Sequence, residues 1–198
     1  MYLSNILGKS VNEPIHSNNG VGDIRALWHR PQKQRVKGQR LLATDGTSLT
    51  YTLLYYIPGL TTYCPHRRTP ILTGYMSGCY LFRYRLHGQL YVAHVGTHDT
   101  NQEFNDKAKS AWKTFVASQP VTDVMGFDPI NDVSDALLAR AVAVGAKPAI
   151  VGAWEQDGSA RVGVVVSDGA NPGNRIIVDL EYARLRPWRE IQTDPKMA

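Results

Sequence analysis

One segment of the chain, residues 73–95, limits the possible folds more than any other. It is dense in Tyr, Phe, Leu and Val and is interrupted once, at His87-Gly88, a pair that can form a two-residue turn. Before the turn, aromatic residues between Tyr80 and Tyr84 alternate with Cys79 and Leu81, so both faces of this strand are largely apolar. We predict a central β-hairpin that is covered on both sides.

The other elements follow from turn residues and apolar spacing. Asp45-Gly46 favours a type I′ turn and therefore a hairpin. Apolar residues spaced by three and four predict helices at 102–118 and 131–144, the first capped by Asp99 or Thr100. Strands, then two helices, then more strands predict an α+β protein with a mixed, mostly antiparallel β-sandwich or sheet and flanking helices. The later strands are predicted at 149–155, 160–167 and 175–181.

The N-terminal part of the sequence shows no such spacing. Residues 1–38 mix Asn, Gly, Pro and basic residues, which predicts a loosely structured basic arm with a short helix near 23–28, followed by one domain at 39–198. The net charge of +5 is concentrated at 29–40, where five Lys or Arg stand without an acidic residue. This basic segment is either a solvated loop or a patch that docks on a target.

Composition narrows the environment in which the protein works. Two cysteines are too few for a disulfide scaffold, and we expect both to be reduced. Cys64 and His66 could bind a metal only with further ligands, which the sequence does not offer, so we expect no metal and no cofactor. No apolar stretch is long enough to span a membrane, and we expect no classical signal peptide.

The predicted hairpin brings a thiol near an imidazole. With a two-residue turn, residues whose numbers sum to 175 face each other, so Cys79 lies opposite Gly96 and diagonal to His94, with Cα atoms roughly 7 to 8 Å apart. An imidazole can take the thiol proton and later protonate a departing amine. Spacing alone favours the other interpretation, a buried cysteine beside a structural histidine.

The residues around the thiol add to this pattern. Ser77 and Gly78 are small, so a substrate carbonyl could approach closely and backbone N–H groups could stabilise an oxyanion. Thr73 is six residues before Cys79, and on a regular strand it would share the same side and could orient His94. We therefore take Thr73, Cys79 and His94 as candidate catalytic residues, and Ser77 and Gly78 as candidates for substrate approach.

The sequence from Thr73 to Cys79, Thr-Gly-Tyr-Met-Ser-Gly-Cys, followed after fifteen residues by His94-Val-Gly-Thr, resembles a known motif pair. It is similar to Thr-x-x-Leu-Ser-Gly-Cys and His in the glutamine deamidase superfamily that includes the cytotoxic necrotizing factor catalytic domain, Burkholderia lethal factor and the chemotaxis receptor deamidase CheD. Met76 replaces the usual Leu. Families of this kind fold as sandwiches with the Cys and His on adjacent central strands.

The resemblance implies a bacterial toxin or effector that converts a glutamine of a target protein to glutamate through a cysteine thioester. Thr73 would match the third site residue of the family. The partner would be a protein substrate such as a host GTPase or a translation factor, and the protein would be secreted or translocated into a host cell and act as a monomer. We do not expect a nucleic-acid partner. Two alternatives stay open: a protease or transglutaminase-like Cys-His enzyme, and a non-catalytic basic binding module.

Overall fold

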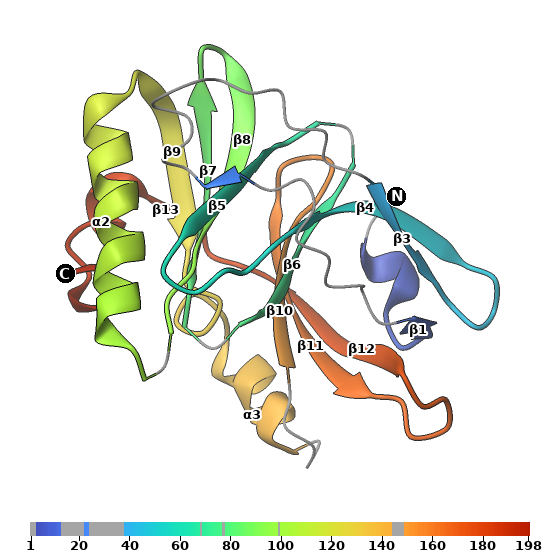
Figure 1. Ribbon diagram of the computed structural model, residues 1–198. Helices are drawn as coiled ribbons and strands as arrows, with labels where there is room; N and C mark the ends of the chain where they lie inside the picture. The colour runs from blue at the N-terminus through green and yellow to red at the C-terminus, as the bar shows by residue number, and fades with distance from the viewer. Residues whose placement is uncertain are drawn as a thin grey trace.

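Two β-sheets lie face to face, with helices outside them (Figure 1). The computed structural model describes residues 3–12, 22–23, 38–67, 69–76, 78–98, 100–143 and 149–198. Neighbouring strands are antiparallel in most of the described pairs, and β4 with β6 is a parallel pair. The protein is therefore of the α+β class with a mostly antiparallel sandwich, as the sequence predicts.

We call the larger sheet sheet A. Its described strands bury one face against the second sheet and the other against the N-terminal segment. In spatial order they are β1 (Ser10–Asn12), β12 (Asn174–Tyr182), β11 (Ala160–Ser167), β10 (Ala149–Trp154), β6 (Ile71–Met76), β4 (Ser48–Leu54) and β3 (Gly38–Leu42).

The smaller sheet, sheet B, contains the predicted central hairpin. Its strands are in spatial order β13 (Arg186–Pro187), β9 (Val121–Phe127), β7 (Tyr80–Leu86), β8 (Gln89–Val95), β5 (Thr61–Pro65) and β2 (Gly22–Asp23). The strands β7 and β8 form the hairpin, and both turn residues have positive φ, 49° at His87 and 76° at Gly88. These angles are those of a type I′ turn, which matches the right-handed twist of the two strands.

The helices cover the outside of the sandwich. The longest, α2 (Gln102–Ser118), packs on the outer face of sheet B through Trp112 and Phe115, and α3 (Asp135–Ala143) packs near β11 and β12 (Figure 1). Asn101 caps α2, since its side chain accepts a hydrogen bond from the Phe104 N–H at 3.1 Å, so the predicted cap at Asp99 or Thr100 is wrong. The short helices are η1 (Leu3–Ile6), α4 (Trp188–Ile191) and η2 (Pro195–Met197).

The alternation in β7 separates two hydrophobic layers. Tyr80, Phe82 and Tyr84 face α2, and Phe82 stacks on Trp112 with ring centroids 4.4 Å apart. Leu81 and the preceding Cys79 face sheet A and belong to the layer between the sheets. The prediction that this strand is covered on both sides is confirmed.

Two predicted details of the backbone differ from the structure. The apolar stretch from Thr73 to Leu86 is not one strand, because β6 ends at Met76 in sheet A and β7 begins at Tyr80 in sheet B. The Asp45-Gly46 hairpin forms, but only Gly46 has positive φ, 85°, which excludes type I′. The Asp45 carboxylate accepts from the Thr47 N–H at 2.9 Å, which favours a longer loop with the glycine in the left-handed region.

The N-terminal segment is more ordered than the sequence predicts. Leu3, Ile6 and Val11 are buried on the outer face of sheet A, β1 pairs with β12, and β2 pairs with β5. The loosely structured arm predicted at 1–38 is thus wrong for residues 3–12 and 22–23. Short segments with one or two apolar side chains show no periodicity, so only their burial reveals them. The helix predicted near 23–28 and most of the basic segment lie outside the described residues.

Candidate active site

The hairpin register places the candidate thiol and imidazole on one face of adjacent strands. Tyr80 pairs with Val95 and Leu81 with His94, so the pairing continues the sum of 175 and sets Cys79 diagonal to His94. Both side chains face the layer between the sheets, because they share the face of Leu81. His94 lies on β8, whereas Cys79 lies just before β7, whose first residue is Tyr80.

His94 is fully buried, with 0% of its surface exposed. Neither ring nitrogen has a hydrogen-bond partner among the described residues, although one nitrogen must carry a proton and the other a lone pair. The ring packs against the Tyr56 ring with centroids 5.5 Å apart and lies between Leu81 and Thr62 on the neighbouring strands. Buried polar groups without a partner are rare in folded proteins and cost free energy.

Cys79 is also buried, 2% exposed, but it has polar neighbours. The Thr97 hydroxyl lies 3.6 Å from the Cys79 Sγ and 3.1 Å from the Gly78 carbonyl oxygen, and its single proton can be donated to either. The thiol in turn can donate to the Thr97 carbonyl at 3.9 Å. No hydrogen bond joins the Cys79 Sγ to His94 in this state, since neither ring nitrogen is bonded.

Thr97 and Tyr56 connect the two candidate residues. The Tyr56 hydroxyl donates to the Thr97 carbonyl at 2.6 Å, while its ring packs on His94. Sequence reasoning did not select either residue for the site. The register could have found Thr97, because 78 and 97 sum to 175 and place it opposite Gly78. Tyr56 lies outside the hairpin, and no sequence signal places it next to His94.

Burial sets the protonation of both groups. It lowers the pKa of His94 to about 3, so the ring is neutral at physiological pH. Burial also raises the pKa of Cys79, against the lowering effect of the hydrogen bonds from Thr97 and from the Gly78 backbone, and the charge of Asp128 raises it further. The free protein therefore holds a neutral thiol and a neutral imidazole.

Thr73 lies in the other sheet, on β6. Its hydroxyl donates to the Gly152 carbonyl and accepts from the Gly152 N–H, both at 3.0 Å, at the point where the pairing of β10 with β6 is irregular. The expected role in orienting His94 is not seen, because the Thr73 hydroxyl is engaged at Gly152. The reason is the change of sheet between Met76 and Tyr80, which ends the even spacing along one strand.

Two glycines beside the thiol differ in what they allow. A Cβ at Gly96 would lie 2.3 Å from the Ile57 carbonyl oxygen and 2.9 Å from that of Leu60, so the backbone approach excludes any side chain. A Cβ at Gly78 would meet no described atom within 4 Å. The space over Gly78 is therefore open next to the thiol. Ser77 lies outside the described residues.

A cluster of charged side chains lies at the end of sheet B next to Cys79. The Asp128 carboxylate, fully buried, accepts from Lys196 Nζ at 2.8 Å, and Arg186 bonds Asp132 at 2.8 Å and Asp194 at 2.9 Å. The Tyr80 hydroxyl donates to Asp194 at 3.1 Å. These contacts attach the C-terminal segment to the start of β7, directly after Cys79.

Outside this region, the described residues include few other candidate nucleophiles or metal ligands. Within the described ranges, no three His, Cys, Asp or Glu side chains gather in a way that could hold a metal ion. Cys64 is fully buried between the sheets, and burial raises its pKa far above that of a free thiol. None of the described helices is both long enough and apolar enough to cross a membrane.

Comparison with known proteins does not extend the resemblance beyond the motif. No family model matches the chain, and no curated protein matches its sequence. The fold defines the class, a strand-rich α+β sandwich.

Proposed function

We propose that the chain is a cysteine-dependent protein-glutamine deamidase of the bacterial toxin and effector kind, with Cys79 as nucleophile and His94 as acid and base. The observation that supports it most is the register of β7 with β8, in which Leu81 pairs with His94, so that Cys79, just before β7, is diagonal to His94. The ring of His94 supports it further, since it has no hydrogen-bond partner among the described residues and a buried imidazole without one is costly to keep.

In the proposed reaction, the Cys79 sulfur attacks the side-chain amide carbon of a glutamine while His94 takes the thiol proton. The C–N bond breaks, the imidazolium returns the proton to the departing nitrogen, and ammonia leaves a thioester. Water activated by His94 then hydrolyses the thioester, which yields glutamate and restores the thiol. No electrons are exchanged and no cofactor is needed.

Access to the thiol would be over Gly78. Cys79 itself is 2% exposed, and the open space at Gly78 is the described opening beside it. A flat carboxamide could approach there, and the backbone N–H groups of residues 78 and 79 would be near its oxygen. Ser77 and Gly78 keep the role of substrate approach in this proposal.

The test uses the two buried cysteines as a matched pair. Lysate proteins from a eukaryotic cell would be incubated with wild type, Cys79→Ala or Cys64→Ala protein and examined by mass spectrometry for glutamine converted to glutamate. We expect conversion at one or a few sites with wild type and Cys64→Ala, and none above background with Cys79→Ala. Conversion that survives in Cys79→Ala, or is absent with wild type, would sink the proposal.

The product separates the alternative enzymes. Deamidation leaves an intact target that has gained one acidic residue, whereas a protease leaves fragments and an acyl transferase leaves cross-links that depend on an added amine. The target would be a host protein such as a GTPase or a translation factor, reached after secretion or translocation. A binding module would give no covalent change, and its binding would fall steeply with salt.

A further inference from the structure

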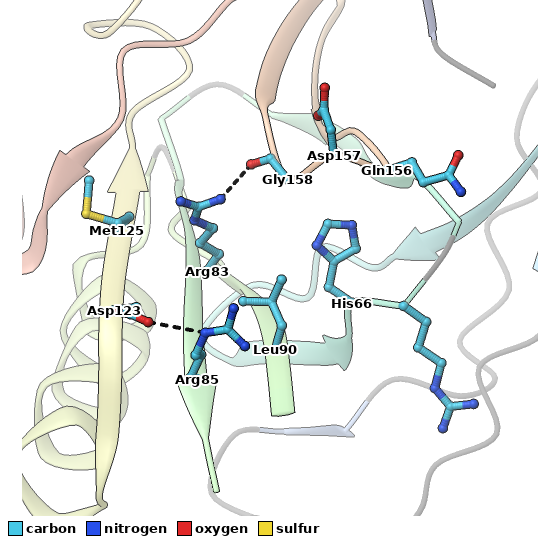
Figure 2. Close-up of a pocket in the computed structure, with 10 residues that line it drawn as sticks. His66, Arg83, Arg85, Leu90, Asp123, Met125, Gln156, Asp157 and Gly158 are labelled. Atoms are coloured by element: carbon cyan, nitrogen blue, oxygen red, sulfur yellow. Dashed lines mark hydrogen bonds and ion pairs between the residues drawn. The ribbon is translucent and has the colours of Figure 1, made fainter. Parts of the chain in front are cut away.

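A cationic pocket opens at the other end of the sandwich from Cys79. It has a volume of about 410 Å³ and lies between the far half of β7, the residues that follow β5, and the turn from β10 to β11 (Figure 2). Arg83 is four residues beyond Cys79, which at the rise of a β-strand is roughly 13 Å along β7. The pocket is therefore separate from the candidate active site, and its capacity to bind a ligand does not depend on the proposed function.

His66 forms the inner wall of this pocket. It is 5% exposed, and neither ring nitrogen has a hydrogen-bond partner of normal geometry among the described residues. Figure 2 shows the ring between Arg83 and the turn that carries Asp157. Among the described residues, the backbone of Glu155 lies near the ring without a hydrogen bond of normal geometry, so the ring has hydrogen-bonding capacity left for a ligand in the pocket.

Arg83 supplies the second side chain of the pocket that could bind a ligand. Its guanidinium donates one hydrogen bond, to the Gly158 carbonyl at 2.8 Å, and lies over the Trp154 ring at 5.9 Å. It forms no ion pair within the described part of the chain, so its other N–H donors remain for an acceptor in the pocket. Gly158 is needed for this approach, since a Cβ there would lie 2.9 Å from Arg83 Nη1.

The rim of the pocket adds further positive charge. Arg67 is exposed and makes no ion pair with a described residue, whereas Arg85 is paired with Asp123 at 3.2 Å. The Asp157 carboxylate is turned to the Ser159 N–H and hydroxyl at 2.8 and 2.7 Å. Three arginines and two aspartates leave one positive charge in excess among the described residues that line the pocket.

Asp123 shows how the backbone shapes this rim. It has a φ of 52°, in the left-handed region, at a bulge where β9 shifts register against β7 between Arg83 and Arg85. A β-bulge redirects side chains, and here it accompanies a carboxylate bonded to Arg85 rather than to Arg83. Among the described residues, Arg83 has no ion-pair partner.

We propose that this pocket binds a phosphate monoester, with Arg83 and His66 holding the phosphoryl oxygens and Leu90 and Met125 lining the organic part. A guanidinium and an imidazole from different directions suit a tetrahedral group with several acceptor oxygens and about two charges. The volume of about 410 Å³ exceeds what a free anion fills and suits a small organic phosphate.

The test is calorimetric titration of the full chain with glycerol 2-phosphate at constant ionic strength. We expect saturable binding that Arg83→Gln weakens at least ~10-fold, a loss of about 1.4 kcal/mol. Arg189→Gln, at an exposed residue of α4 outside the pocket, removes the same charge and should change nothing. Equal effects of the two variants, no saturation, or equal affinity for acetate would overturn the proposal. Arg67→Gln, at the exposed rim, repeats the test should Arg83→Gln fail to fold.

Sulfate, which remains doubly charged between pH 5.5 and 7.5, gives a second readout. The groups facing His66 are Arg83, Asp157 and the Glu155 backbone, and burial together with Arg83 lowers its pKa. A bound dianion favours the protonated ring, so sulfate should bind to wild type more tightly at pH 5.5 than at pH 7.5. In His66→Gln the difference in affinity between the two pH values should be smaller. The same pH dependence in both proteins would exclude His66 as a ligand.

Discussion

At the scale of residues, two buried cysteines share the inner face of sheet B, yet their surroundings differ. Cys79 has a hydroxyl and a carbonyl of Thr97 beside it, whereas Cys64 has an apolar environment in which burial alone sets its pKa. Chemical reactivity should therefore separate them, whatever the protein acts on.

Alkylation with iodoacetamide should modify Cys79, and the rate should keep rising with pH beyond about 8.5, the pKa of a free thiol. Burial raises the pKa of Cys79, so the thiolate forms only in more alkaline solution. Peptide mass spectrometry at a series of pH values measures the rate, with Cys79→Ala as control for Cys64. A rate already constant from pH 6 would mean a preformed thiolate and would contradict the neutral pair.

Gly78→Ala should separate access from folding. No described atom lies within 4 Å of the added Cβ, so the free energy of unfolding should change by less than about 0.5 kcal/mol. If the substrate approaches over Gly78, glutamine conversion should fall by a factor of ten or more. Urea unfolding and the mass-spectrometric assay measure the two quantities, and unchanged conversion would remove Gly78 from the substrate path.

His94 should make the protein sensitive to acid. Its pKa is lowered from 6.5 to about 3 by burial, so below pH 6.5 the unfolded chain takes up a proton that the folded chain refuses. The stabilisation is complete above that pH and is lost as the pH falls toward 3. Between pH 7.5 and 5.5 the loss is about 1.4 kcal/mol. In urea unfolding, the free energy of unfolding should fall between these two pH values by about 1.4 kcal/mol less in His94→Leu than in wild type. An identical fall in both proteins would show that His94 is accessible to protons in the folded state.

At the scale of elements, the β7–β8 hairpin depends on what holds its end beyond His94. The Gly96 N–H donates to the Leu60 carbonyl at 3.0 Å, and the Gly59 N–H donates to the Gly96 carbonyl at 2.9 Å. This close approach connects the end of β8 to the segment before β5, and it leaves the position opposite Cys79 without a side chain.

Gly96→Ala should destabilise the protein, because its methyl group would lie 2.3 Å from the Ile57 carbonyl oxygen and the backbone would have to move. We expect a loss of about 2 to 3 kcal/mol in the free energy of unfolding, in the range measured for overpacked sites. Gly78→Ala is the matched control in the same hairpin. A loss below about 0.5 kcal/mol for Gly96→Ala would mean that the segment at 57–60 adapts freely.

At the scale of the whole molecule, the C-terminal segment is attached by charge as well as by packing. Arg186, 14% exposed, connects β13 to Asp132 before α3 and to Asp194 before η2. Ile191 and Met197 add buried contacts to the layer beneath α2. The segment thus joins three parts of the chain that are far apart in sequence.

Arg186→Met should cost about 2 to 4 kcal/mol in the free energy of unfolding, because two aspartates, one of them nearly buried, lose their partner. Arg140→Met removes an exposed pair with Asp179, in which the arginine side chain is 66% exposed, and should cost less than about 0.5 kcal/mol. Chemical denaturation of both variants gives the comparison. Similar losses would mean that the Arg186 cluster contributes little.

The sequence determined the hairpin, its register and the α+β class. A two-residue turn and an alternating strand are local features, and with the turn in place the pairing of Leu81 with His94 follows by counting. The helix α2 was equally readable, from its apolar spacing. The motif residues Cys79 and His94 could therefore be placed on adjacent strands without a structure.

The tertiary structure alone decided what surrounds that hairpin. Thr73 and Gly152 are hydrogen-bonded to each other within sheet A, away from the hairpin. The Tyr56 ring packs on His94 from outside the hairpin, and His66 and Arg83 line one pocket although they come from separate segments. Such contacts join residues that are distant in sequence, so no period or spacing encodes them. Burial, and with it the pKa of each buried group, is set only when the two sheets pack together.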